Sequence, residues 1–158
     1  MMARTGTHLP KVALVASAGG HLSQLRRVAK AWSGLPTFWV TSGRMVSGSL
    51  GENAKVYAVG ECNRQHPMRV IGVLARCIVI ALKERPDIVI STGAAPGCLM
   101  ILLGKLLGAK AVWLDSVTNV ERPSLSGRLV RPFADLFLVQ WPELVEKYPK
   151  AEYVGAVI

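Results

Sequence analysis

Short apolar runs alternate with stretches of helical spacing along almost the whole chain, and this alternation restricts the possible folds more than any other feature. The runs that predict buried strands lie at residues 12–16, 37–41, 55–59, 87–90, 110–114, 135–139 and 152–154. Helical spacing separates them at residues 21–32, 67–84, 96–108, 125–133 and 142–147. Apolar strands that alternate with helices predict the α/β class: a Rossmann-like parallel sheet with helices on both faces.

The length of 158 residues fits one domain with a core of its own. We expect a short tail at residues 1–10 and a single domain at residues 11–158. Three cysteines and three histidines are scattered, which predicts neither a zinc site nor a disulfide framework, and we expect no metal and no other cofactor. The scattered cysteines make a reducing cytoplasm the default expectation, and no run reaches the roughly 18 apolar residues of a membrane span.

The formal net charge of +9 predicts an anionic partner, with solubility alone as the alternative. Because the basic residues have little aromatic interleaving, a nucleic acid is the least favoured partner. The predicted helix at residues 67–84 is apolar nearly all round and carries Arg69, Arg76 and Lys83 as one narrow basic stripe. Such a helix is either buried between layers or lies at a membrane interface.

Two small-residue loops follow predicted strands and precede predicted helices. The first contains Ser17, Gly19 and Gly20, and the second contains Ser91, Thr92 and Gly93. Ligands of parallel sheets bind at the carboxyl ends of the strands, and a helix start offers free N–H groups to an anion. We therefore predict a phosphate or pyrophosphate site at these loops, with a tight structural turn as the alternative for the first. Neither the P-loop nor the dinucleotide fingerprint is present.

Two side chains at the predicted site edge are candidates for proton transfer. His21 begins the helix after the first loop and can donate to a phosphate or take a proton from a hydroxyl; a packing or capping role is the alternative. Asp115 follows the predicted strand at residues 110–114, where it can act as a base or bind a hydroxyl. Its alternative is a turn or cap together with Ser116, which we also include among the acceptor-binding residues.

The chain resembles the acceptor-side, membrane-recruiting subunit of bipartite UDP-sugar glycosyltransferases over residues 11–158. The segments that carry the resemblance are Ser17-Ala18-Gly19-Gly20-His21-Leu22, Ser91-Thr92-Gly93-Ala94-Ala95-Pro96-Gly97, Trp113-Leu114-Asp115-Ser116, Ser124-Leu125-Ser126-Gly127-Arg128-Leu129, Ala134-Asp135-Leu136-Phe137, Gln140-Trp141-Pro142-Glu143 and Tyr153-Val154-Gly155. The bacterial exopolysaccharide and capsule branch, called PssD or CpsF, fits best, and the subunit that helps make chitobiosyl-diphosphodolichol is similar. Many members have Glu in place of Asp115, and the eukaryotic members carry an N-terminal membrane anchor that residues 1–10 are too short to form.

The resemblance implies the N-terminal half of a GT-B glycosyltransferase, similar to the first half of the single-chain enzyme that forms lipid II. It implies a chain that binds a polyprenyl-pyrophosphate-linked saccharide at the inner face of the cell membrane, while a second Rossmann-like chain binds the UDP-sugar. Such a chain is expected to be inactive without that partner, which we expect to contact Val154, Val157 and Ile158. The alternative is a recruitment module that contributes no catalytic group.

Overall fold

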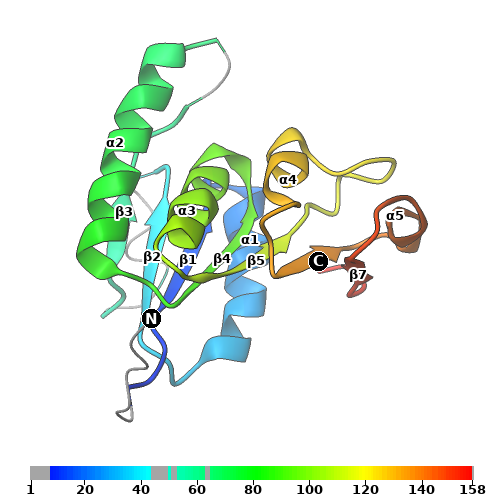
Figure 1. Ribbon diagram of the computed structural model, residues 1–158, viewed down its shortest axis with the longest axis horizontal. Helices are drawn as coiled ribbons and strands as arrows, with labels where there is room; N and C mark the ends of the chain where they lie inside the picture. Colours follow the sequence, from blue (N-terminus) through cyan, green and yellow to red (C-terminus); the bar gives the residue numbers. More distant parts are fainter. Residues whose placement is uncertain (1–7, 44–49, 51–52, 63–64, 158) are drawn as a thin grey trace.

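A computed structural model describes residues 8–43, 50, 53–62 and 65–157, and seven parallel strands form one sheet in it (Figure 1). The order across the sheet is β3-β2-β1-β4-β5-β6-β7. The strands are β1 (Val12–Ala16), β2 (Thr37–Thr41), β3 (Val56–Ala58), β4 (Ile88–Gly93), β5 (Lys110–Leu114), β6 (Leu136–Val139) and β7 (Ala151–Tyr153). This order is the doubly wound one, which reverses direction between β1 and β4.

Helices cover both faces of the sheet, as predicted. They are α1 (Gly20–Val28), α2 (Pro67–Glu84), α3 (Ala94–Leu106), α4 (Leu125–Val130) and α5 (Pro142–Lys147). On one face Leu22 and Leu25 of α1 join the apolar cluster that contains Leu14 and Ile90. On the other face α2 and α3 pack together over a larger cluster that includes Trp113 (Figure 1).

Several predicted boundaries differ from those in the structure, and three of the differences lie near the predicted loops or the α1-side core. The helix predicted at residues 21–32 ends at Val28 and continues as a 3₁₀ turn, Ala29–Trp32, whose first and last residues both pack against the α1-side cluster. Ser91, Thr92 and Gly93 belong to β4 rather than to a loop. Pro96 is not the first helical residue, because α3 already begins at Ala94. A Cβ at Gly97 would lie 1.9 Å from Ser91 Oγ, so this glycine leaves the room that lets α3 pack on the end of β4.

None of the helices in the described part of the chain combines the length and apolar character that a bilayer crossing requires.

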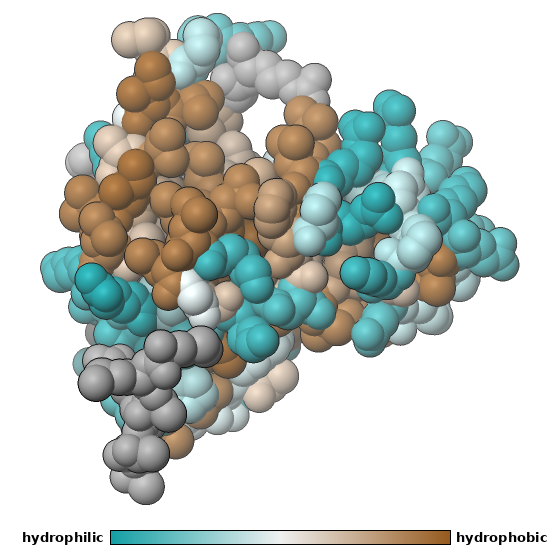
Figure 2. Space-filling view, in the orientation of Figure 1, coloured by the Kyte–Doolittle hydropathy of each residue, from teal (hydrophilic) through white to brown (hydrophobic). Residues whose placement is uncertain are grey.

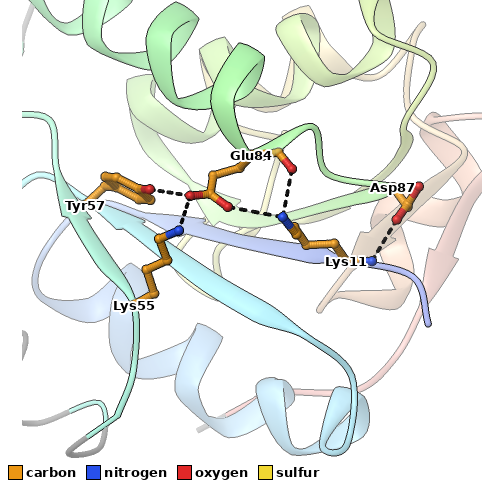
Figure 3. A network of polar contacts seen from close by, with 5 residues as sticks. All are labelled: Lys11, Lys55, Tyr57, Glu84 and Asp87. Carbon is orange, nitrogen blue, oxygen red and sulfur yellow. Dashed lines mark hydrogen bonds and ion pairs between the residues drawn. The ribbon is translucent and has the colours of Figure 1, made fainter. Parts of the chain in front are cut away.

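The buried carboxylate of Glu84, at the end of α2, holds several elements together at the amino edge of the sheet (Figure 3). It accepts hydrogen bonds from Tyr57 and Lys55, and Lys11 Nζ lies 3.3 Å from its Oε2. Burial by itself raises the pKa of Glu84, but the hydrogen bonds from Lys55, Tyr57 and Lys11 outweigh burial and lower it to about 2. The ionised carboxylate therefore ties α2 to β3 and to the residue that precedes β1.

We expect the folded state to lose the contribution of Glu84 as the pH falls from about 4.5 towards 2. The folded-state pKa is below the ordinary value of 4.5, so the stabilisation is complete above that value and disappears as the carboxylate is protonated. The lowered pKa corresponds to about 3 kcal/mol. Chemical denaturation at pH 7 and pH 3 should show Glu84→Gln destabilised by about 2–3 kcal/mol at pH 7 and by much less at pH 3. Glu143→Gln, on the exposed start of α5, is the control; a pH-independent loss in Glu84→Gln would contradict the assignment.

Candidate functional site

The candidate site lies at the carboxyl edge of the sheet, where the strand order reverses between β1 and β4, and ligands of open parallel sheets bind at such a reversal. Gly19 has a φ of 97°, a conformation that favours glycine, and it precedes α1 without a side-chain cap. The N–H groups of the first turn of α1 therefore have no acceptor within the helix. Ser42, after β2, holds the loop by accepting a hydrogen bond of 2.9 Å from Ala18 N.

His21 joins the two predicted loops across this reversal. Its Nδ1 lies 3.0 Å from the carbonyl oxygen of Thr92, and the ring packs directly over Gly93, where a Cβ would be 2.5 Å from Nδ1. The pairing of β1 with β4 shifts by one residue there, because Val15 faces Ser91 and Ala16 faces Gly93. Thr92 is the extra residue of this bulge, and its carbonyl is directed at the imidazole. A neutral His21 that donates from Nδ1 keeps the lone pair of Nε2 available for a proton.

Ser91 and Thr92, predicted to bind pyrophosphate, are fully buried. Thr92 Oγ1 donates to the carbonyl oxygen of His21, and Ser91 Oγ accepts from Gly93 N at 3.2 Å. Their hydroxyls thus hold the end of β4 to α1 and to its own turn. Gly20, unlike Ser91 and Thr92, is exposed, and nothing lies within 4 Å of the place that a Cβ would occupy.

Asp115 is buried beneath the connection that follows β5, and both of its carboxylate oxygens are engaged. Oδ1 accepts from Trp113 Nε1 at 3.0 Å and from Ser124 Oγ at 2.9 Å, and Oδ2 accepts from Asn119 Nδ2 at 2.9 Å and from Ser124 N at 3.2 Å. Ser124 in turn caps α4 by accepting from Gly127 N. The carboxylate therefore organises the loop at residues 115–124 and the start of α4.

Ser116 lies in the same connection and is also buried. Its hydroxyl is 3.0 Å from Thr118 Oγ1 and accepts from Thr118 N at 3.3 Å. This is the local turn that the sequence offered as the alternative reading of the segment.

Gln140 lies in a segment that carries the family resemblance, but the sequence assigned it no role, and in the structure it links distant segments. It is 3% exposed, and its Nε2 donates to the carbonyl oxygen of Asp115 at 2.9 Å and to Gln24 Oε1 of α1 at 3.0 Å. Its Oε1 accepts from Val157 N at 2.7 Å. Only the fold brings these four segments together, since Gln24 and Gln140 by themselves lie 116 residues apart in the sequence.

The segment after β7 is held along its backbone while part of its side-chain surface remains exposed. Val154 N donates to Val139 O at 3.1 Å, and the Val154 side chain is exposed, as is that of Tyr153. Val157 is half-buried and borders a basin lined by Ser23, Arg26, Arg27 and Lys30. Ile158, also predicted to contact a partner, lies outside the described residues.

Two cavities lie next to the loops that His21 joins, and they differ in polarity. A polar cavity of about 280 Å³ is lined by Ser17, Ala18, Ser42, Glu61, Cys62, Arg69, Ala94 and Pro96. A mainly apolar cavity of about 450 Å³ is lined by His21, Cys62, Val70, Ala94, Ala95, Cys98, Leu99, Ser124, Leu125, Ser126 and Leu129. Ser17 of the first predicted loop thus lines the polar cavity. Arg69, which the sequence analysis placed only in the basic stripe of a helix, adds a positive charge to the same cavity.

The remaining members of that predicted stripe lie on the side of α2 that faces β3. Arg76 Nη1 donates to Val59 O at 2.8 Å, and Lys83 Nζ lies 5.8 Å from the centre of the Tyr57 ring.

Comparison with known families gives a match to the family described as "Oligosaccharide biosynthesis protein Alg14 like" over residues 50–157, which is more than half of the chain. The UDP-N-acetylglucosamine transferase subunit ALG14 of Mus musculus is 41% identical over 85 residues, which cover 50% of this chain and 39% of the mouse protein. The subunit from Schizosaccharomyces pombe is 46% identical over 79 residues, covering 46% of this chain and 37% of that protein. The subunit from Yarrowia lipolytica is 27% identical over 94% of this chain and 82% of that protein.

Solved structures confirm the predicted Rossmann-like fold and its likeness to GT-B proteins. MurG from Acinetobacter baumannii superposes with a TM-score of 0.68 at 15% identity, over 92% of this chain and 43% of MurG. UDP-N-acetylglucosamine 2-epimerase from Rickettsia bellii gives a TM-score of 0.69 at 15% identity, over 94% of this chain and 45% of the epimerase. At this identity the likeness concerns the fold alone.

Proposed function

The chain belongs to the Alg14-like family of oligosaccharide biosynthesis proteins, and we propose on that premise that it is the acceptor-binding, membrane-recruiting subunit of a two-component glycosyltransferase. In this proposal residues 11–158 form the acceptor-side domain. A separate chain binds the UDP-sugar, as in the bacterial exopolysaccharide and capsule systems. The acceptor is a saccharide linked to a polyprenyl pyrophosphate, and the complex works at the cytoplasmic face of the cell membrane.

The observation that supports this function most directly is the position of His21 between two uncapped helix starts. The N-cap residues of α1 and α3 are Gly19 and Gly93, and neither helix has a side-chain hydrogen bond from its N-cap residue. Backbone N–H groups at such helix starts bind phosphate oxygens, and the helix dipole favours the negative charge. In our proposal Gly19 and Gly20 present this backbone to the acceptor pyrophosphate, Ser17 adds a hydroxyl, and Gly93 leaves the room that the His21 ring occupies.

His21 is the group we propose for proton transfer. The acceptor hydroxyl oxygen forms a bond to the anomeric carbon of the donor sugar, the bond from that carbon to UDP breaks, and Nε2 of His21 takes the hydroxyl proton. The hydrogen bond from Nδ1 to Thr92 O fixes the imidazole in the tautomer that this step requires. Ser91 and Thr92 then act through the position of His21 and Gly93 rather than by touching the acceptor.

In this proposal Asp115 does not act as a base. Its four hydrogen bonds fix the loop that carries Ser116 and the start of α4, so we assign it a positioning role. The second candidate function is a recruitment module without catalytic groups. It is favoured by the observation that both carboxylate oxygens of Asp115 already accept hydrogen bonds within the protein. Substitution of His21, considered in the Discussion, separates the two.

The function is tested by reconstitution. The chain and a candidate donor-binding chain are assayed separately and together with UDP-N-acetylglucosamine and a polyprenyl-pyrophosphate-linked saccharide, and the lipid product is measured by mass spectrometry. We expect product only from the mixture, because the chain supplies the acceptor side of the reaction. Robust transfer by this chain alone would contradict the two-component proposal.

Membrane recruitment is supported by an exposed apolar face on α2 and its neighbours. The large exposed apolar residues there are Met68, Ile71, Ile78, Val79 and Leu82 of α2, Leu106 and Leu107 at the end of α3, and Leu125, Leu129 and Phe133 in and after α4. Figure 2 shows hydrophobic residues gathered over this side of the molecule. A patch of this kind, next to basic residues, is typical of proteins that lie on a membrane surface.

We expect the chain to float with anionic vesicles at low salt and to be released from them at high salt. Each basic residue near an anionic surface contributes about 1 kcal/mol, and salt screens this attraction. Ile71→Glu should weaken binding, because it places a carboxylate in the apolar face, whereas Val145→Glu on exposed α5 is the matched control. Equal binding to neutral and anionic vesicles would reject the electrostatic part of the proposal.

A further inference from the structure

The side-chain amide of Gln140, directly after β6, is bonded to three different segments of the chain. Its oxygen accepts from Val157 N, and its nitrogen donates to Asp115 O and to Gln24 Oε1. A primary amide has two N–H donors, and both are used here. Because Gln140 is almost fully buried, the loss of any one of these partners would leave a buried polar group unsatisfied.

Two of these partners determine which way the amide lies. Val157 N is a backbone donor and Asp115 O is a backbone acceptor, and neither can exchange its role. The oxygen of Gln140 must therefore face the C-terminal segment, and its nitrogen must face the loop after β5. The second N–H then requires an acceptor from α1, which Gln24 supplies with Oε1.

Gln24 connects this amide to His21. The two residues are three positions apart in α1, so their side chains lie on the same side of the helix, one turn apart. The helix is therefore held at two points: His21 Nδ1 lies 3.0 Å from Thr92 O, and Gln24 Oε1 lies 3.0 Å from Gln140 Nε2. Two contacts on one side of a helix fix its rotation about its own axis, and with it the direction of His21 Nε2.

The C-terminal segment reaches Gln140 by turning back after β7. Gly155 has a φ of 79°, a conformation that favours glycine. The segment is bonded on both sides of this turn, through Val154 N to Val139 O and through Val157 N to Gln140 Oε1. Its valine side chains are those that we expect the partner chain to contact, so a partner bound there acts on the same segment that Gln140 holds.

We propose that Gln140 is a positioning residue that fixes α1, and with it His21, to the C-terminal segment on which the partner chain docks. The inference rests on the proposed function and adds to it a route by which docking sets the position of the group that takes the acceptor proton. Gln140 itself does not touch the acceptor; it acts through Gln24 and α1.

Hydrogen exchange of the full chain tests the link without a partner and without turnover. Val157→Pro removes the N–H whose bond Gln140 accepts, and Val157→Ala, which keeps that N–H, is the control for the loss of the valine side chain. We expect the amides of residues 23–28 to exchange about threefold to tenfold faster in Val157→Pro than in Val157→Ala, since a lost hydrogen bond lowers the free energy of local opening. Equal exchange of these amides in the two variants would overturn the proposal.

The reconstituted complex then tests the consequence for catalysis. Gln24→Met removes the acceptor for Gln140 Nε2, whereas Gln24→Glu supplies a carboxylate oxygen in its place. We expect Gln24→Met to lower kcat about tenfold with an unchanged KM for UDP-N-acetylglucosamine, which the partner chain binds, and Gln24→Glu to retain the kcat of the unsubstituted complex. A Gln24→Met complex with an unchanged kcat would overturn the proposal.

Glu84→Gln is the control for a loss of stability alone. It breaks a buried network at the amino edge of the sheet, away from α1, so its kcat should stay unchanged. If the mixture of the two chains transfers no sugar, the proposed function falls, and the exchange comparison still decides whether Gln140 links the segment to α1. If the mixture transfers sugar while exchange and kcat stay unchanged in the variants, the function stands and the role of Gln140 falls.

Discussion

His21→Asn should lower the turnover of the reconstituted complex by about 10²–10⁴-fold, the range expected when a general base is removed. Asparagine is chosen because its amide Nδ2 can replace Nδ1 as the donor to Thr92 O, while nothing replaces Nε2. The packing of the side chain over Gly93 and the link between α1 and β4 are therefore kept. Product formation under single-turnover conditions is the measurement, so that changes in product release do not hide the chemical step.

His66→Asn is the matched control, since His66 precedes α2 and lies outside both cavities. Thermal unfolding of the two variants should match that of the unsubstituted chain, which separates a loss of catalysis from a loss of structure. If the His21→Asn complex is fully active and the His21→Ala complex is not, the imidazole serves only as a structural hydrogen-bond donor. In that case the recruitment function would be favoured over a catalytic one.

Val154→Asp should weaken association with the donor-binding chain by about 30-fold or more, the effect of losing an interface hot spot. The side chain is 46% exposed, yet its backbone is fixed by the bond to Val139 O, so it is presented without a large ordering cost. A carboxylate there would be buried against the partner without a counter-charge. Surface plasmon resonance or co-purification measures the loss.

Val145→Asp gives the comparison, because it introduces the same charge at an exposed valine of α5. Both variants should keep the melting temperature of the unsubstituted chain, since neither side chain is part of the core. Unchanged association of Val154→Asp would place the partner interface elsewhere on the chain. The basin of Arg26, Arg27 and Lys30, which borders Val157, is then the next surface to substitute.

The sequence by itself determined the fold class and the position of the strand-to-helix turn before His21. Apolar runs such as residues 12–16 and 110–114 can be buried on both faces only in a covered parallel sheet, and the structure has strands at those positions. The glycine pair before His21 predicted a strand-to-helix turn at the carboxyl edge, and Gly19 adopts the positive φ that such a turn requires. These features are local, because they depend on backbone conformation and on the period of the apolar pattern.

The tertiary structure alone decided which polar side chains are buried and hold distant segments of the protein together. Ser91, Thr92 and Asp115 have the composition of binding residues, but each is buried and bonded to a segment or turn whose position the sequence does not give. Gln140 joins α1, β6 and the segment after β7 for the same reason. A hydroxyl or carboxylate can satisfy the backbone or bind a substrate with the same atoms, so its role depends on which partners the packing of the helices on the sheet brings within hydrogen-bond distance.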